Sequence, residues 1–305
     1  IFSVCRRLKN KIYYKEIKCN IDRIIYIPGY LISRRAIMAN TLHSLSRSAA
    51  NNKSDVLKGT PHDDVLHGSL GHTTFYGGLG DDIYYSKNAG DTIVEYANEG
   101  NDTVYADTTF TLPTHVENLT LEGNGNTFGF GNNSNNILIG NSGNNRLSGE
   151  EGNDFLYGMG GHDTLSGGNG NDHLNGGDGD DYLAGGLGSD TIITGAGRDT
   201  VAFTAADIRE GSIDRLLDFN PETDKFDLSG MRSLLTGSNA NLSWSKMFVD
   251  KDPEVILQKD HPYLIFDTEQ QTLAYRAAGS SSSTVFAKFD SDDPSKWLDA
   301  SNIIG

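Results

Sequence analysis

Carboxylates recur between residues 131 and 202 at a fixed spacing that suits the binding of metal ions. Aligned in blocks of nine, 149–202 places aspartate at the sixth position of every block, whereas 131–148 places asparagine there. Glycine occupies the first or second position of each block, and an aliphatic residue occupies the eighth. Three positions kept in register over consecutive blocks indicate a repeated structural unit. The aspartates are Asp154, Asp163, Asp172, Asp181, Asp190 and Asp199.

The elements that must position these aspartates are short turns and strands. Glycines at the first, second and fourth positions allow positive φ and close backbone approach, so positions one to six predict a turn. Positions seven to nine then predict a three-residue strand whose middle side chain points inward. Because successive units alternate sides, two units close one coil, and the coils stack into a parallel β-roll, a β-solenoid of the all-β class. The turn glycines that we expect at the metal sites are Gly149, Gly158, Gly167, Gly168, Gly170, Gly176, Gly177, Gly179, Gly185, Gly186 and Gly188.

Calcium is the metal that this arrangement favours. One buried aliphatic side chain per nine ordered residues does not offset their loss of conformational entropy, so a further source of stability is expected. Turns on one side belong to units n and n+2, which stacks Asp154 over Asp172 and Asp163 over Asp181, and places Asp199 at the end of its series. Two carboxylates about 5 Å apart repel each other by about 3 kcal/mol at an effective dielectric constant of about 20. Calcium removes this repulsion because it takes several oxygen ligands from carboxylates and turn carbonyls, whereas magnesium prefers a strict octahedron.

The pattern G-G-x-G-x-D-x-U-x, in which U is a large aliphatic residue, resembles the RTX (hemolysin-type) calcium-binding repeat. The resemblance covers 149–202 and implies a parallel β-roll with several calcium ions (Ca2+) between turns on the same side. It also implies export by the type I secretion machinery to an extracellular location. At Asn136 and Asn145 the sequence departs from the pattern, because asparagine replaces the aspartate that binds calcium in the family.

A shorter repeat block lies upstream of the main β-roll at 131–202. The units of 59–85 place Asp64 and Asp82 at the sixth position with Thr73 between them, so we expect a calcium-binding pair of Asp64 and Asp82. The segment 86–130 resembles the longer β-solenoid spacer found between RTX blocks. Its alternating residues predict strands rather than helices, at Thr92–Glu95, Thr103–Tyr105 and Val116–Leu121.

The segment 203–305 is expected to be a β-rich cap with a more usual apolar content. Asp214–Phe219 and Asp224–Ser229 resemble the segments that close the roll in serralysin-type C-terminal regions, and this resemblance implies an uncleaved secretion signal at the end of the chain. Solenoids need caps that cover their open ends. The elements expected in this cap are a hairpin of Tyr263–Asp267 and Thr272–Arg276, a strand at Thr284–Phe289, and apolar contacts from Trp297, Leu298, Ile303 and Ile304.

The first residues differ in composition from the rest of the chain. Residues 1–39 contain nine lysines and arginines against two acidic residues. An apolar stretch at 24–32 is followed by arginines rather than by a small-residue cleavage site, which argues against a signal peptide. We expect 1–37 to be a basic extension outside the fold, either translated upstream sequence or the edge of a fragment, and 38–58 to be a linker.

Composition excludes several classes of protein. The 305 residues carry 41 acidic and 25 basic side chains, and the net charge of -16 argues against nucleic acids and anionic membranes as partners. No apolar run is long enough for a transmembrane segment. Both cysteines, Cys5 and Cys19, lie near the start of the chain, so a disulfide scaffold is excluded for the remainder.

Motifs of the common hydrolases are missing from the sequence, so we predict that the chain is not an enzyme. None of its histidines belongs to H-E-x-x-H, and no G-x-S-x-G nucleophile elbow is found. His162 and His173 fall at outward positions of the repeat. Carboxylate pairs could serve as the acid and base of a glycosidase, but their regular repetition favours metal binding.

Three functions agree with these observations. The first is a secreted calcium-binding protein whose β-roll folds on binding calcium after type I export. The second is the C-terminal RTX part of a secreted hydrolase, such as a serralysin-like protease, a lipase or an epimerase, that lacks its catalytic domain. The third is a surface or matrix adhesion protein that contacts a cell surface or a polysaccharide.

Overall fold

The computed structural model describes residues 45–47, 54–231, 234, 248–249, 262–267, 270–277, 280–290 and 303–304. All of these residues belong to one unit, formed by residues 42–305. The predictions made for 1–37, for most of 38–58, and for Trp297 and Leu298 lie outside the described residues.

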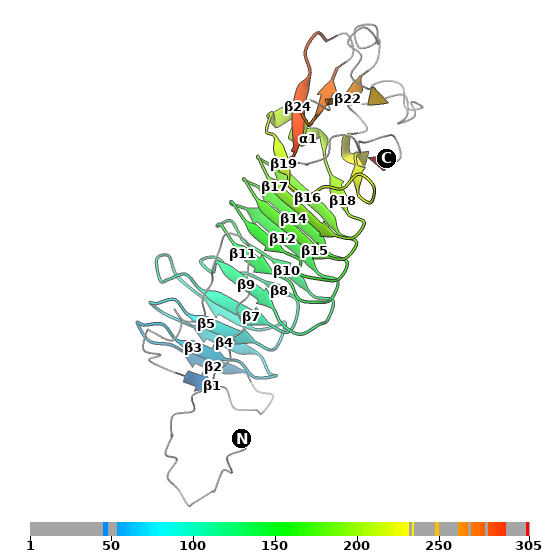
Figure 1. Cartoon of the computed structure of the whole chain (residues 1–305). Helices are drawn as coiled ribbons and strands as arrows, with labels where there is room; N and C mark the ends of the chain where they lie inside the picture. Colours follow the sequence, from blue (N-terminus) through cyan, green and yellow to red (C-terminus); the bar gives the residue numbers. More distant parts are fainter. Residues whose placement is uncertain are drawn as a thin grey trace, which may run out of the picture. The chain divides into compact units, whose positions relative to one another are not determined.

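Parallel strands from successive coils form the core of this unit (Figure 1). The first sheet has 14 strands, of which the coils supply β1 (Leu45–Arg47), β3 (Val65–His67), β5 (Ile83–Ser86), β7 (Thr103–Ala106), β9 (Asn118–Leu121), β11 (Ile137–Ile139), β13 (Phe155–Tyr157), β15 (His173–Asp178), β17 (Thr191–Ala196) and β19 (Asp214–Leu216). The C-terminal region adds β24 (Thr284–Phe289), β23 (Thr272–Arg276), β22 (Tyr263–Asp267) and β21 (Phe248–Val249).

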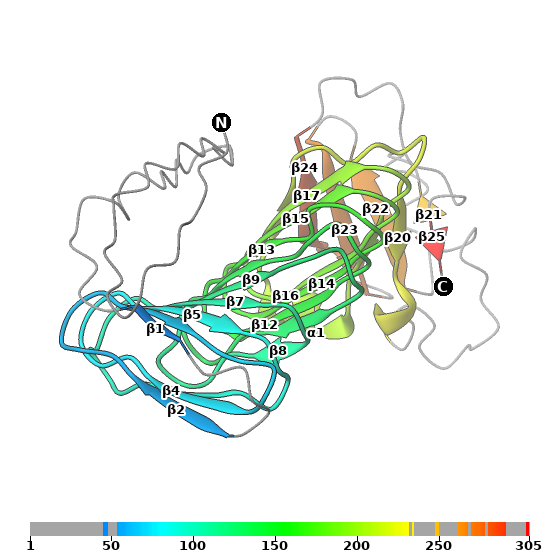
Figure 2. The same cartoon turned by 90° about the horizontal axis from the view of Figure 1, so that it is seen from below.

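Two further sheets carry the alternate strands of the coils. A 3-stranded sheet contains β2 (Asp55–Lys58), β4 (Thr73–Tyr76) and β6 (Thr92–Val94). An 8-stranded sheet contains β8 (Phe110–Thr111), β10 (Phe128–Phe130), β12 (Arg146–Glu151), β14 (Thr164–Asn169), β16 (Tyr182–Leu187), β18 (Thr200–Ala202), β20 (Lys225–Asp227) and β25 (Ile303–Ile304). Figure 2 shows β2 and β4 on the side of the coils opposite β1 and β5. The expected fold class is confirmed as a parallel β-solenoid of about eight turns with almost no helix.

Two nine-residue units make one coil, as the repeat predicts. Leu156 pairs with Leu174 in the first sheet, and Leu165 pairs with Leu183 in the 8-stranded sheet. The aliphatic side chains at the eighth position have no exposed surface in any block from Leu138 to Val201. They form a row along the inside of the coils, because the middle residue of each short strand points inward.

Five strands of the main repeat block, β12 and β14 to β17, are longer than the three residues predicted, whereas β11, β13 and β18 have three residues. β14, β15, β16 and β17 each contain six residues and continue through the glycines at the start of the next unit. Gly168 pairs with Gly186 across the 8-stranded sheet. Gly168 has a φ of +117°, and a β-carbon there would overlap the backbone carbonyl of Glu150 in the coil below. Glycine therefore extends the ladder because it lets the backbones of successive coils approach closely.

The spacer keeps the solenoid but varies the length of its coils. Ile83 pairs with Thr103, which lies 20 residues further along the chain, and Thr103 pairs with Asn118, only 15 residues further. The strands predicted in this segment correspond to β6, β7 and β9, whereas β8 and β10 were not predicted. On the opposite side, the 3-stranded sheet ends at β6 and the 8-stranded sheet begins at β8.

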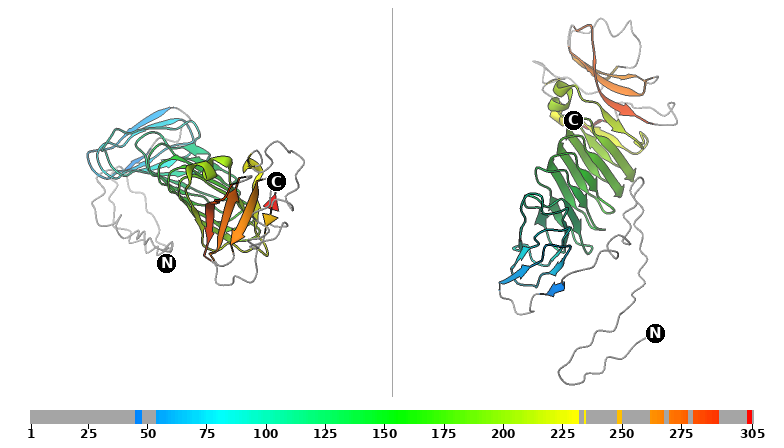
Figure 3. Two further views of the ribbon diagram at one scale, coloured as in Figure 1. Left: turned by 90° about the horizontal axis from the view of Figure 1, so that it is seen from above. Right: turned by 90° about the vertical axis from the view of Figure 1, so that its left-hand side faces the viewer.

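The described part of the C-terminal region closes the last coils with β-structure and one short helix (Figure 3). Helix α1 (Ala205–Glu210) begins at a capping box on Thr204 and ends at Gly211. The predicted hairpin is confirmed as the antiparallel pair β22 and β23, and the predicted strand at 284–289 is β24. Phe219 stacks on Phe226 with ring centroids 4.3 Å apart. None of the helices among the described residues has the length and apolarity needed to cross a bilayer.

Candidate metal centre

Two columns of polar side chains run along the solenoid, one at the start of the strands on each side. We call them column A and column B. Members of column A immediately precede or begin strands of the 14-stranded sheet, and those of column B immediately precede strands of the 8-stranded sheet. Column A contains Asp64, Asp82, Asp102, Glu117, Asn136, Asp154, Asp172, Asp190 and Asp214, and column B contains Asn145, Asp163, Asp181, Asp199 and Asp224.

One oxygen of each repeat aspartate belongs to a ladder of hydrogen bonds between coils. The backbone N–H of Asp154 donates to Asp172 Oδ1 at 2.8 Å in column A. The backbone N–H of Asp163 donates to Asp181 Oδ1 at 2.7 Å in column B. The same bond joins Asp172 to Asp190 and Asp181 to Asp199. The predicted stacking of units n and n+2 is thus the arrangement in the structure.

The second oxygen of these carboxylates is buried and accepts no hydrogen bond. This holds for Oδ2 of Asp154, Asp163, Asp172, Asp181 and Asp199. Each of these residues is at most 2% exposed. A buried carboxylate oxygen needs either hydrogen-bond donors or a cation, because its loss of hydration is otherwise uncompensated. The Oδ2 atom of each of these carboxylates is therefore suited to coordinate a cation.

Backbone carbonyls converge on the same oxygens. A β-carbon on Gly149 would overlap Asp154 Oδ2 and would lie 2.6 Å from the carbonyl oxygen of Gly167 in the next coil. A β-carbon on Gly158 would lie 2.5 Å from Asp163 Oδ2. The glycine at the first position thus leaves room in which a carboxylate oxygen and a carbonyl oxygen face each other, and oxygen-only ligands of this kind suit calcium.

The predicted glycines occupy two distinct places. Gly149, Gly158, Gly167, Gly176 and Gly185 each face the aspartate of their own block. The others have positive φ and lie against the backbone of the coil below, namely Gly168, Gly170, Gly177, Gly179, Gly186 and Gly188. The first set borders the carboxylates, whereas the second set permits the close stacking of the coils.

Burial also controls the protonation of the columns. Burial, together with the charge of Asp172, raises the pKa of Asp154 to about 7 against the lowering effect of the hydrogen bond from the backbone N–H of Asn136. For Asp163 burial likewise raises the pKa to about 7, and for Asp172 to about 6. Burial raises the pKa of Asp181 as well. Without a cation, ionising these carboxylates therefore costs free energy at neutral pH.

At the sixth position of the first two units, asparagine has hydrogen-bond partners for both its side-chain oxygen and its side-chain nitrogen, and so needs no cation. Asn136 Oδ1 accepts the backbone N–H of Asn132 at 2.7 Å, and its Nδ2 donates to the carbonyl of Glu117 at 3.2 Å. Asn145 Oδ1 accepts the backbone N–H of Asn141, and its Nδ2 donates to the carbonyl of Thr127 at 3.2 Å. The amide thus bonds to the coil below, and neither asparagine leaves the unpartnered oxygen seen in the aspartates.

The upstream pair Asp64 and Asp82 is brought together, and Asp102 extends it. The backbone N–H of Asp64 donates to Asp82 Oδ1 at 2.7 Å, and that of Asp82 donates to Asp102 Oδ1 at 2.8 Å. Asp64 Oδ2 accepts the backbone N–H of Thr60. By contrast, Oδ2 of Asp82 and of Asp102 is buried without a hydrogen-bond partner. Burial raises the pKa of Asp82 to about 7 and that of Asp102 to about 8.

Four members of the columns, Asp102, Glu117, Asp214 and Asp224, were not singled out from the sequence as metal ligands. Asp102 follows Asp82 by 20 residues, and the segment Asn101–Val104 repeats the x-D-x-U core of the repeat. The backbone N–H of Asp190 donates to Asp214 Oδ1 at 3.0 Å, and that of Asp199 donates to Asp224 Oδ1 at 3.2 Å. The expectation that Asp199 ends its series is therefore wrong, because column B continues to Asp224.

The described residues contain no compact cluster of metal-binding side chains. Within the described ranges, no group of three or more histidine, cysteine, aspartate or glutamate side chains is placed to hold a metal ion. The centres in the columns consist instead of stacked carboxylate pairs and the carbonyl oxygens of the glycine turns.

Comparison with known proteins adds a family assignment to these repeats. The RTX calcium-binding nonapeptide repeat matches in four copies, at residues 50–84, 58–93, 130–165 and 166–201. No curated protein matches the chain. Among solved structures, the chain is similar to a subunit of the Azotobacter vinelandii mannuronan C5-epimerase, determined in solution, with 23% sequence identity over 56% of this chain and 78% of that chain and a TM-score of 0.27. The chain therefore carries RTX calcium-binding nonapeptide repeats in two blocks, and repeats of this family bind several calcium ions per array.

Proposed function

We propose that the chain is a secreted calcium-binding protein whose β-roll folds when calcium enters the two columns outside the cell, after type I export. The observation that carries this proposal is the row of buried, unpartnered Oδ2 atoms in both columns. We propose that Asp154, Asp163, Asp172, Asp181, Asp190 and Asp199 provide the carboxylate ligands, and that Asp82, Asp102, Asp214 and Asp224 extend them.

The metal-free columns work against folding. Each ionised aspartate is buried beside another in the next coil, and both burial and the neighbouring charge raise its pKa. Bound calcium supplies the positive charge that lets two stacked carboxylates stay ionised. Once the carboxylates are held, the N–H···Oδ1 ladder and the strand pairs link each coil to the next.

The difference in calcium between compartments would direct this folding. Extracellular calcium sites have dissociation constants of about 10⁻⁴ to 10⁻³ M, and sites this weak stay empty at cytosolic calcium concentrations. Ligands that bind only the folded state stabilise it by mass action, so the roll gains stability where calcium is abundant. Export of an unfolded chain and folding outside the cell are therefore parts of one proposal.

A binding role, rather than a catalytic one, follows for the columns. The same stacked carboxylate pair recurs from coil to coil in 149–202. Because each of these coils has the same ligands, no single coil is marked out as a reaction centre. The hydrolase and adhesion alternatives stay predictions from the sequence.

Circular dichroism of the full chain tests the proposal. We expect the β-signal to increase cooperatively as calcium is added to metal-free protein, to decrease in chelator, and to respond little to equal magnesium. The variant Asp172→Asn should need more calcium for the same signal. The exposed Asp178→Asn, which makes the same chemical change outside the columns, should behave as wild type. A full β-signal in chelator with unchanged thermal stability would contradict the proposal.

A further inference from the structure

Glu95 occupies a place that the repeat gives to glycine. β4 and β6 pair Tyr76 with Val94, so Glu95 lies one coil above Gly77, the first residue of its unit. The backbone N–H of Gly77 donates to Glu95 Oε1 at 3.1 Å. Glu95 is only 7% exposed, although glutamate is rarely buried unless it is paired. This carboxylate is therefore part of the interior of the coil.

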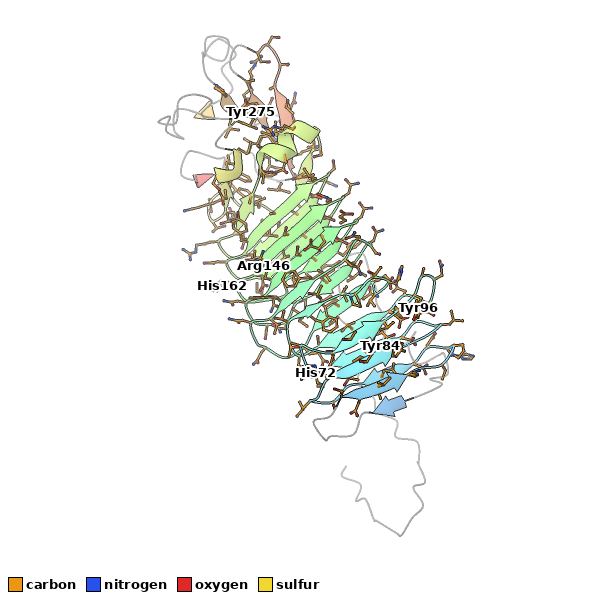
Figure 4. The ribbon with its side chains drawn as sticks, turned by 180° about the vertical axis from the view of Figure 1, so that it is seen from behind. His72, Tyr84, Tyr96, Arg146, His162 and Tyr275 are labelled. Carbon is orange, nitrogen blue, oxygen red and sulfur yellow. The ribbon has the colours of Figure 1, made fainter. Side chains whose placement is uncertain are left out.

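Oxygens from three side chains meet beside Gly77. A β-carbon on Gly77 would overlap Asp82 Oδ2, the Tyr84 hydroxyl oxygen and Glu95 Oε1. The Tyr84 hydroxyl donates a hydrogen bond to Glu95 Oε1. Tyr84 stands at the eighth position of its unit, where the main block has aliphatic residues, and it is completely buried (labelled in Figure 4). The missing side chain of Gly77 thus leaves a volume bordered by two carboxylates and a phenol.

Both carboxylates keep an oxygen without a hydrogen-bond partner. These atoms are Asp82 Oδ2 and Glu95 Oε2, and both are buried. Carboxylates buried side by side in the interior need either a proton or a cation to be stable there.

We propose that Asp82 and Glu95 bind one calcium ion beside the hydroxyl of Tyr84. This inference rests on the proposed calcium binding and adds a ligand, Glu95, that the nonapeptide pattern does not contain. Calcium suits the site because both proposed ligands are carboxylates and because the coordination geometry of calcium is flexible. The competing occupant is a proton shared between Glu95 and Tyr84.

Calcium stoichiometry is the first measurement. In equilibrium dialysis of the full chain at saturating calcium chloride, Glu95→Gln should bind one calcium ion fewer per chain than wild type. The matched control is Glu151→Gln, because Glu151 is exposed and is the last residue of strand β12 in the main block. It should bind as many ions as wild type. Equal binding by Glu95→Gln, with an unchanged β-signal, would overturn the inference and would mean that a proton holds Glu95 and Tyr84 together.

Terbium luminescence provides a second measurement that does not depend on Glu95→Gln folding. Terbium chloride supplies an ion that takes calcium-like oxygen ligands and emits when a tyrosine close to it absorbs light. Tyr84→Phe removes the absorbing group and keeps both carboxylates. We expect lower tyrosine-excited emission from Tyr84→Phe than from wild type at equal bound terbium. Equal emission would show that no ion lies next to Tyr84.

The two proposals fail in different ways. If Asp172→Asn loses calcium while Glu95→Gln and Tyr84→Phe match wild type, the calcium-binding roll stands and the Glu95 site does not. If wild type itself binds no calcium, the proposed function fails, and the Glu95 site fails with it.

Discussion

The coil at 131–148 and the coils at 149–202 pair their strands in the same way but differ in the charge of the sixth residue. Both place a fully buried leucine at the eighth position, as Leu147 and Leu165 show. In both, the backbone N–H of the sixth residue donates to a carboxylate oxygen in the next coil, as Asn145 and Asp163 show. In the first coil the sixth residue is an amide that also donates to the coil below. In the later coils it is a carboxylate, and Oδ2 is buried without a hydrogen-bond partner in Asp154, Asp163, Asp172, Asp181 and Asp199.

This difference separates the shape of the solenoid from its dependence on a cation. Asn145 and Asp163 stand one above the other in column B, so the geometry of the coil accepts either residue. Only the carboxylate brings a charge that burial penalises. If calcium binds as proposed, it stabilises the later coils by neutralising their carboxylates, whereas the shape of each coil comes from the chain itself.

The largest expected effect is that of pH on the metal-free protein. Burial raises the folded-state pKa of Asp154, Asp163 and Asp199 to about 7, well above the value of about 3.9 in an unfolded chain. Between these values the folded state binds more protons, so the free energy of unfolding decreases as pH rises through this window. Urea unfolding of dialysed, metal-free protein should therefore show its highest midpoint near the acidic end. A midpoint that rises with pH would contradict the account.

Calcium should reverse this dependence. Protons compete with calcium for the same carboxylates, so calcium binding weakens as pH falls through the raised pKa values. The same urea experiment at saturating calcium is the control for the preceding prediction.

The next effect is that Asp163→Asn should change the free energy of unfolding in opposite directions with and without calcium. With calcium at 100 times its dissociation constant, loss of one ion should lower the free energy of unfolding by about 2.7 kcal/mol. In chelator the same variant should be more stable than wild type, because an amide like that of Asn145 replaces a buried charge. Thermal unfolding in the two conditions checks both signs. Destabilisation in chelator as well would mean that the carboxylate stabilises the coil without calcium.

The reverse exchange, Asn145→Asp, should give the asparagine coil the properties of its neighbours. It removes the donor that bonds to the carbonyl of Thr127 and adds a carboxylate next to Asp163. We expect the free energy of unfolding in chelator to fall by about 1–3 kcal/mol, which is the cost of a buried polar group left without a hydrogen-bond partner. Isothermal titration should show one more calcium ion bound than in wild type. An unchanged stoichiometry would show that the turn at 140–145 cannot bind calcium even with an aspartate.

The smallest effect concerns the second position of the block. Met159 has a φ of +79°, where the next unit on the same side has Gly177. A non-glycine residue in this region costs about 1–2 kcal/mol, so Met159→Gly should stabilise the roll by about 1 kcal/mol in calcium. Met159→Ala keeps the strained backbone and should give no such gain. Equal stability of the two variants in thermal unfolding would contradict this explanation.

The sequence predicted the regular coils well, because glycine, aspartate and an aliphatic residue each have one structural role at a fixed period. It did not predict Asp214 and Asp224, since the chain between Asp199 and β19 contains helix α1 and the spacing rises from 18 to 24 and 25 residues. Asp102 was missed for a related reason, because the coils of the spacer differ in length. Glu95 keeps the 18-residue spacing from Gly77 and was missed because the repeat pattern has glycine, not a ligand, at that position. The continuation of strands through the glycines depends on contacts between coils, which the nine-residue pattern alone does not contain.

Hydrogen exchange of the full chain, followed by mass spectrometry with and without calcium, tests the central claim most directly. The backbone amides of 149–202 should gain much more protection on addition of calcium than those of 131–148, because of these two segments only 149–202 contains carboxylates whose Oδ2 is buried without a hydrogen-bond partner. Peptides of 149–202 that are equally protected in calcium and in chelator would show that calcium does not stabilise the aspartate coils.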